Sequence, residues 1–212
     1  AQTLLLRACG LGTPVLQIWD YQNAKETPPE GIVQVGFNHG EVGRLMARHF
    51  IDSGHRELAF ADSGVLEDYR AHERAEGFVR AARHARVRVR TVLAPTGDAF
   101  DGGRSVLQAL RRQYPQVSAV AFANDHLACG ALMQALEMGL KVPDTIAMLG
   151  FGDFPIGRQL QPALSTMRAP RTEIGRAAAE IVLACLREGT PPQSRWLPCE
   201  LVQRESSARI SS

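Results

Sequence analysis

The sequence predicts an α/β fold in which a largely parallel sheet carries helices on both faces. Short apolar runs alternate along the chain with longer segments whose apolar residues recur at helical spacing. The clearest case is the uncharged run 117–123, which is followed by a helical pattern that ends at Gly139. A strand without charges is typical of a sheet buried on both faces, and the alternation is typical of parallel sheets.

The same alternation places the elements in order along the chain. Strands are expected at 15–19, 32–36, 57–61, 87–93, 117–123, 145–151, 164–168 and 196–202. Helices are expected at 39–53, 69–84, 102–114, 125–139 and 171–187, with a short helical turn after 151. Segment 87–93 alternates valine with arginine and 196–202 contains Pro198, so both are expected at sheet edges. We expect the end of a helix at 3–8, turns at 10–14 and 189–192, a loop at 21–31 and a frayed tail at 206–212.

Composition limits the classes of function. The chain has 212 residues, of which 45% are hydrophobic and 22% charged, and its net charge is +2, which is typical of a globular protein without a strongly basic surface. The four cysteines, Cys9, Cys129, Cys185 and Cys199, lie far apart without a C-x-x-C motif, which favours reduced cytoplasmic thiols over a disulfide frame or a zinc site. No apolar run is long enough to span a membrane and no signal peptide is visible.

Polar or aromatic side chains follow six of the expected strands. They are Trp19-Asp20, Phe37-Asn38-His39, Asp62-Ser63-Gly64, Pro95-Thr96-Gly97-Asp98, Asn124-Asp125 and Phe151-Gly152-Asp153. In open α/β sheets ligands bind outside the carboxyl ends of the strands. Each residue alone is better explained by a turn, and Asp125 is equally well explained by a helix cap. Arg74 is less expected, since it follows a loop that could lean over this edge.

The common catalytic templates are absent. The sequence contains no G-x-x-x-x-G-K-[ST], no G-x-G-x-x-G after a strand, no H-E-x-x-H and no G-x-S-x-G. The histidines have no ligand spacing with cysteine, and His49 lies on an apolar helix face, where a packed histidine is the simpler interpretation. We therefore expect no catalysis, no metal site and no cofactor.

Several short motifs, taken together, resemble one family. They are Gly43-Arg44-Leu45, Ser53-Gly54-His55-Arg56, Arg74-Ala75-Glu76-Gly77-Phe78, Ala123–Gly130, Val142–Ala147, Gly150–Asp153 and Pro162–Thr166. In this order and spacing, over about residues 13–204, the chain resembles the effector-binding core of LacI/GalR-family transcriptional repressors. The resemblance implies a ligand-sensing, cytoplasmic, non-enzymatic regulator of sugar or sugar-acid metabolism.

The resemblance also implies a type I periplasmic-binding-protein-like fold, with two parallel-sheet lobes and a sugar-sized cleft between them. The N-terminal lobe would comprise 1–37 and 169–193, the C-terminal lobe 38–168 and 194–204, and 205–212 would be a tail. The resemblance implies that the N-terminal lobe is incomplete and that the helix-turn-helix headpiece that reads operator DNA lies upstream of Ala1. The start of the chain without methionine likewise leads us to expect a missing upstream part. Three chain crossings would suit hinge closure around a ligand.

Site residues follow from the resemblance by position. Arg74 matches the family's effector-gripping arginine, Asn124 a ligand-contacting asparagine with Asp125 beside it, and Phe37 an aromatic residue of the cleft. Two departures concern carboxylates. Gly152 stands where the family usually has an aspartate, with Asp153 one residue later, and Trp19 stands at another such position, with Asp20 next. Fewer carboxylates beside Arg74 favour an acidic ligand, because guanidinium pairs bidentately with carboxylate.

The aromatic and acidic residues at these strand ends look most like those of gluconate-utilisation repressors, so gluconate is the expected effector. The resemblance further implies a homodimer, with Cys129 and Leu132 on helix 125–139 and Leu160 in the following loop at the interface. Leu132 is equally well explained as core, whereas Cys129 lies off the main apolar stripe and Leu160 stands between glutamines.

Two rival functions remain open. A periplasmic sugar-binding protein of a transporter would have the same fold, but the missing signal peptide and the motif 124–128 disfavour it. A flavodoxin-like or dinucleotide-dependent enzyme is disfavoured by the missing phosphate loops. No membrane partner is expected.

Overall fold

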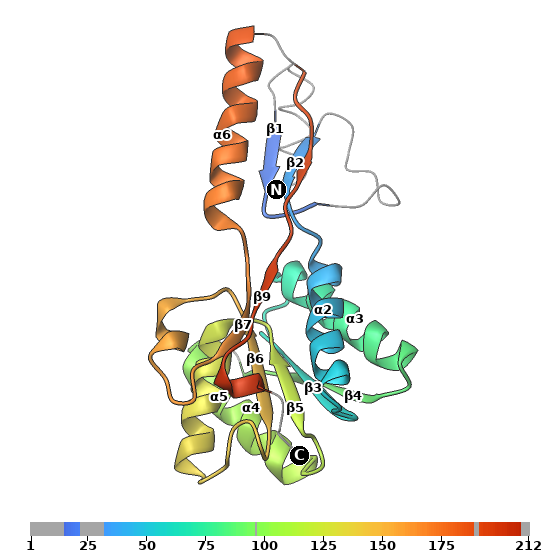
Figure 1. The fold of residues 1–212 in the computed structure, drawn as a ribbon, viewed down its shortest axis with the longest axis vertical. Helices are drawn as coiled ribbons and strands as arrows, with labels where there is room; N and C mark the ends of the chain where they lie inside the picture. The colour runs from blue at the N-terminus through green and yellow to red at the C-terminus, as the bar shows by residue number, and fades with distance from the viewer. Residues whose placement is uncertain (1–14, 22–31, 96, 189–190, 209–212) are drawn as a thin grey trace. The chain divides into compact units, whose positions relative to one another are not determined.

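The computed structural model describes residues 15–21, 32–95, 97–188 and 191–208 (Figure 1). The helix end expected at 3–8 and the turn at 10–14 lie outside these residues, as do most of the loop 21–31, the first two residues of the turn 189–192 and the last four of the tail.

The chain divides into two compact units. Unit 1 is Ala1–Asn38 with Ala169–Cys199, and unit 2 is His39–Arg168 with Glu200–Ser212. The third crossing therefore falls at 199–200, not at 193–194 as expected. The reason is that Arg195–Trp196 forms a strand, β8, which pairs with Val35 and Gly36 in unit 1.

Among its described residues, unit 1 contains a parallel sheet and one long helix. Strands β1 (Val15–Ile18) and β2 (Ile32–Gly36) pair in register along their length, and β8 pairs with the end of β2, so the order is β1-β2-β8. Helix α6 (Arg171–Glu188) packs against β1 and β2. The predicted helix and the first two predicted strands are confirmed to within one residue at each end.

Unit 2 is built on a six-stranded sheet in the order β4-β3-β5-β6-β7-β9. The strands are β3 (Glu57–Asp62), β4 (Arg88–Leu93), β5 (Ala119–Phe122), β6 (Ala147–Phe151), β7 (Ser165–Arg168) and β9 (Glu200–Val202). All neighbours pair in parallel except β7 and β9. The predicted parallel sheet is confirmed, and so is the position of 87–93 at an edge.

Four helices accompany this sheet. They are α2 (His39–Asp52), α3 (Tyr69–His84), α4 (Ala99–Gln113) and α5 (Asp125–Glu137), and α2 packs beside α3 as α4 packs beside α5 (Figure 1). Helix α4 begins three residues before its predicted start. Asp98 caps it, since its carboxylate accepts hydrogen bonds from the amides of Phe100 at 2.8 Å and Asp101 at 3.2 Å.

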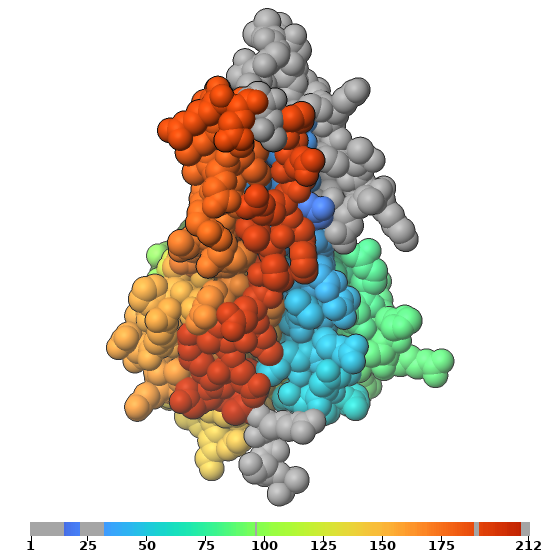
Figure 2. Space-filling model, turned by 45° about the horizontal axis from the view of Figure 1, so that its top comes forward, coloured from blue at the N-terminus to red at the C-terminus, as the bar shows by residue number. Residues whose placement is uncertain are grey.

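The C-terminal segment differs from prediction in two ways. The single strand expected at 196–202 is two strands, β8 and β9, which lie on either side of Pro198 and join different sheets. The segment expected to fray contains a short helix, η2 (Glu205–Ser207), with Ser206 and Ser207 buried. Ser206 Oγ donates to the carbonyl of Met148 at 2.7 Å, and Ser207 Oγ lies 2.8 Å from Nε2 of His49 on α2. Figure 2 shows this segment, in red, against the cyan surface of α2.

Candidate functional site

A buried arginine, Arg74, lies where strands β5 and β6 of unit 2 end. It belongs to the second turn of α3 and is only 4% exposed. Its NH1 group bonds Nδ1 of His39 at 2.8 Å, and its NH2 group donates to the carbonyl of Ala123 at 3.0 Å. Its Cζ atom lies 4.2 Å from the centre of the Phe151 ring, a favourable cation–π distance. Thus groups from α2, α3, β6 and the end of β5 meet at one point.

The bond to Arg74 fixes the tautomer of His39. A guanidinium group can only donate, so Nδ1 of His39 must accept, and this imidazole is neutral with its proton on Nε2. His39 is the first residue of α2 and is buried, with its ring 6.4 Å from that of Phe151 in an edge-to-face arrangement. The imidazole therefore holds one arm of the Arg74 guanidinium without adding charge.

Two glycines allow α2 and α3 to approach each other around Arg74. A Cβ atom at Gly43 would overlap the carbonyl oxygen of Arg74, and one at Gly77 would overlap the carbonyl oxygen of Gly40. The close packing of α2 against α3 thus explains the glycine in each of these two sequence motifs. They set the position of the backbone from which the Arg74 side chain extends.

Asn124 and Asp125 divide their roles at the start of α5. Asn124 is the capping residue, because its Oδ1 accepts from the amide of Leu127 at 3.0 Å. Asp125 is buried and joins three elements instead. Its Oδ1 accepts from Thr166 Oγ1 at 2.6 Å, and its Oδ2 accepts from the amide of Phe154 at 2.8 Å. Burial raises the pKa of the Asp125 carboxyl, and these two hydrogen bonds oppose the rise.

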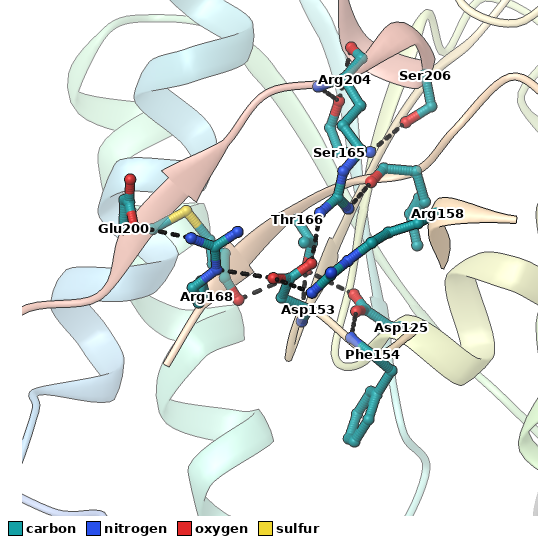
Figure 3. A network of polar contacts seen from close by, with 12 residues as sticks. Asp125, Asp153, Phe154, Arg158, Ser165, Thr166, Arg168, Glu200, Arg204 and Ser206 are labelled. Carbon is teal, nitrogen blue, oxygen red and sulfur yellow. Dashed lines mark hydrogen bonds and ion pairs between the residues drawn. The ribbon is translucent and has the colours of Figure 1, made fainter. Parts of the chain in front are cut away.

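Asp153 is the centre of a network of arginines (Figure 3). Its carboxylate accepts from Arg204 NH2 at 2.5 Å, from Arg168 Nε at 2.7 Å and from Arg158 NH2 at 3.2 Å. Arg168 also donates to Glu200 at 3.3 Å. Burial alone raises the pKa of the Asp153 carboxyl, but the arginines outweigh it, so that this pKa is lowered to about 2. Asp153 therefore remains a carboxylate, and both of its oxygens are engaged.

The other three predicted effector-binding residues lie in unit 1. Trp19 and Phe37 form an edge-to-face pair with ring centres 5.9 Å apart, and the backbone of Trp19 is left-handed with φ 74°. Phe37 and Asp20 are both buried, and Asp20 Oδ2 accepts from the amide group of Gln17 at 3.0 Å. The structure thus brings Trp19 and Phe37 together in unit 1, and Arg74, Asn124, Asp125 and Asp153 onto one edge of the unit 2 sheet. Their contact with an effector stays a prediction.

Two of the three residues predicted for a dimer interface are inside unit 2. Cys129 and Leu132 are both 0% exposed, and burial raises the pKa of the Cys129 thiol to about 12. The prediction that Cys129 lies on an exposed patch is wrong. Helix α5 is covered by α4, β5, β6 and η1 (Pro155–Arg158), so more than one apolar stripe is buried. Leu160 is partly exposed, and the homodimer stays a prediction.

Sequence reasoning missed His39, Arg158, Thr166, Arg168 and Arg204. His39 stood among the polar residues after a strand and was given no role, although its place at the start of a helix beside a strand end was a signal. The arginine partners of Asp153 are 5, 15 and 51 residues away from it, and only Arg158 is near enough for local reasoning.

Two further properties concern the described part of the chain. None of its helices is long and apolar enough to cross a membrane. Among the same residues, no three His, Cys, Asp or Glu side chains are grouped so that they would hold a metal ion.

Comparison with known proteins places the chain beside transcriptional regulators. Residues 47–207 match the model of a periplasmic binding protein-like domain. The HTH-type transcriptional regulator GntR of Pseudomonas aeruginosa is 37% identical over 199 residues, which cover 92% of this chain and 56% of that protein. The chain thus spans about half the length of the curated relatives it matches.

Solved structures agree with this result. A LacI-family transcriptional regulator from Silicibacter pomeroyi superimposes with a TM-score of 0.84 at 31% identity, covering 93% of this chain and 59% of that one. The transcription regulator GntR from Chromobacterium violaceum superimposes with a TM-score of 0.83 at 27% identity, covering 98% and 74%.

Proposed function

Because the chain belongs to the periplasmic-binding-protein-like family and forms an effector-binding core of the LacI/GalR type close to GntR, we propose that it senses a sugar acid and thereby controls operator binding. The observation that carries the proposal is the buried guanidinium of Arg74 at the carboxyl ends of β5 and β6, where open α/β sheets bind ligands. A neutral imidazole, a carbonyl and an aromatic face hold it in a fixed orientation.

An acidic effector is favoured by the charges at this edge of the sheet. The sequence lacks two carboxylates that the family resemblance leads one to expect, at Trp19 and Gly152. The nearby Asp153 does not replace them, because its oxygens accept hydrogen bonds from three arginines. A planar guanidinium binds a carboxylate through two parallel hydrogen bonds, so a sugar acid fits better than a neutral sugar. Gluconate is the favoured acid, because the residues at the strand ends resemble those of gluconate-utilisation repressors.

The rest of the proposal concerns the whole protein. A helix-turn-helix outside this chain would contact operator DNA, and a cytoplasmic homodimer would match two operator half-sites. The regulators to which the chain is similar favour this function over that of a periplasmic binding protein of a transporter.

Operator binding provides the test of this function. The full-length protein is titrated into a labelled fragment from upstream of its own gene, and anisotropy is measured without ligand, with gluconate and with glucose. We expect gluconate to change the apparent affinity for DNA and glucose to leave it unchanged. An affinity for DNA that neither compound alters would contradict gluconate sensing, and equal effects of both would contradict the selectivity for an acid.

A further inference from the structure

The segment that follows β6 has an unusual backbone. Gly152 and Asp153 both have positive φ angles, 133° and 53°. The left-handed region is unfavourable for a residue with a side chain unless the surroundings hold it there. Three hydrogen bonds hold the backbone of this turn: Gly152 donates to the carbonyl of Met167, Asp153 to Thr166 Oγ1 and Phe154 to Asp125.

The side chain of Asp153 adds a second set of bonds from elsewhere in unit 2. Arg158 belongs to η1, Arg168 is the last residue of β7, and Arg204 follows β9 (Figure 3). Arg204 is itself fixed, since its NH1 donates to the carbonyl of Leu164 at 2.6 Å. The carboxylate is thus tied on three sides, and both of its oxygens already accept hydrogen bonds from arginines.

The ring that lies over the Arg74 guanidinium is only two residues before this carboxylate. Phe151 ends β6, and the left-handed turn begins directly after it. The end of the strand that carries the ring is therefore adjacent to the turn that Asp153 holds. Arg168 on β7 and Glu200 on β9 are paired residues, and they stand where the chain leaves unit 2 and re-enters it. Arg168 donates to both Asp153 and Glu200, so the Asp153 carboxylate is linked to β7 directly and to β9 through Arg168.

We propose that Asp153 is a positioning residue of the effector site: by binding Arg158, Arg168 and Arg204 it fixes the turn after β6 and so holds the Phe151 ring over the Arg74 guanidinium. This role replaces the direct effector contact expected from the sequence. Its significance for sensing rests on the proposed function, but the geometric claim does not, so the two can fail separately.

The Nε–Hε resonance of Arg74 in the full-length protein reports the position of the ring without any ligand. A ring above the guanidinium shifts this resonance, and the spectrum of Arg74→Lys identifies it by its loss. Phe151→Leu gives the chemical shift of this resonance when no ring lies beside the guanidinium. We expect Asp153→Asn to move the resonance at least halfway from its original chemical shift toward that of Phe151→Leu. The matched control is Glu200→Gln, which removes the exposed partner of Arg168 but leaves Asp153 its arginines, and it should leave the resonance in place.

A resonance that stays in place in folded Asp153→Asn would overturn the proposal. Should that variant fail to fold, Arg168→Gln removes a single donor from the carboxylate and is expected to give a smaller shift in the same direction. An unmoved resonance in Arg168→Gln would then overturn it. Operator and gluconate titrations are separate measurements, so loss of the proposed function would not be mistaken for loss of this geometry.

Discussion

The guanidinium of Arg74 and the ring of Phe151 form one unit, with Cζ 4.2 Å from the ring centre. The arginine comes from α3 and the ring from the end of β6, and β4, α4, β5 and α5 lie between these two elements in the sequence. A ring under the guanidinium restricts it to one plane and leaves the edge of the fork as its bonding side. This relationship makes the orientation of Arg74, as well as its charge, a property that variants can test.

Replacing His39 tests how Arg74 is held. In His39→Leu the acceptor for Arg74 NH1 is lost, and a buried donor without its partner costs about 1–3 kcal/mol of unfolding free energy. His39→Asn places Oδ1 at the same number of bonds from Cα as Nδ1 and should recover most of this loss. Urea unfolding of both variants measures the difference. Equal destabilisation by leucine and asparagine would show that the acceptor atom does not matter.

Replacing Gly43 tests the close approach of α2 to α3. The Cβ of Gly43→Ala would overlap the carbonyl oxygen of Arg74, and such overpacking costs about 1–3 kcal/mol. Gly175→Ala on α6 is the control, because among the described residues no atom outside the adjacent backbone of α6 lies within 4 Å of its Cβ position. There alanine should stabilise the helix by about 0.5–1 kcal/mol. Thermal unfolding separates the two, and a Gly43→Ala variant as stable as the control would contradict the packing described.

Acid unfolding tests the charge on Asp153. The pKa of this carboxyl is lowered from 3.8 to about 2, so the folded protein favours the ionised form. Its contribution to stability is complete above pH 3.8 and is lost as the pH falls from there toward about 2. The difference in unfolding free energy between the protein and Asp153→Asn should therefore shrink over this interval, by at most about 2 kcal/mol. A difference that stays constant with pH would show that the arginines do not act through the charge.

Local patterns were sufficient to predict much of the fold. The helix expected at 69–84 has those bounds in the structure, and the alternation of valine with arginine correctly placed β4 at an edge. These features depend on neighbouring residues and on which face is buried. The burial of Cys129 and of Ser206 was not predictable in this way, because it depends on elements that pack from distant parts of the chain.

The candidate site was predictable in its location but less so in its contacts. Polar residues after the strands indicated the edge of the sheet where Arg74, Asn124 and Asp125 lie. Which of two adjacent residues caps α5 depends on the backbone at the start of the helix, and the structure assigns this role to Asn124. Two of the three partners of Asp153, Arg168 and Arg204, are brought to it by β7 and by the C-terminal segment, and such long-range pairs leave no spacing in a single sequence.

Calorimetry on the full-length protein, with gluconate as the ligand and glucose as the neutral comparison, measures the selectivity for a sugar acid. Gluconate should bind more tightly than glucose. Arg74→Ala should remove about 1.5–3 kcal/mol of binding free energy, which is about 10- to 150-fold in affinity. Arg74→Lys keeps the charge but loses the planar pair of donors, so its affinity for gluconate should lie between those of the unchanged protein and Arg74→Ala. Glucose binding as tightly as gluconate, or gluconate binding unchanged in a folded Arg74→Ala variant, would show that Arg74 does not select a sugar acid.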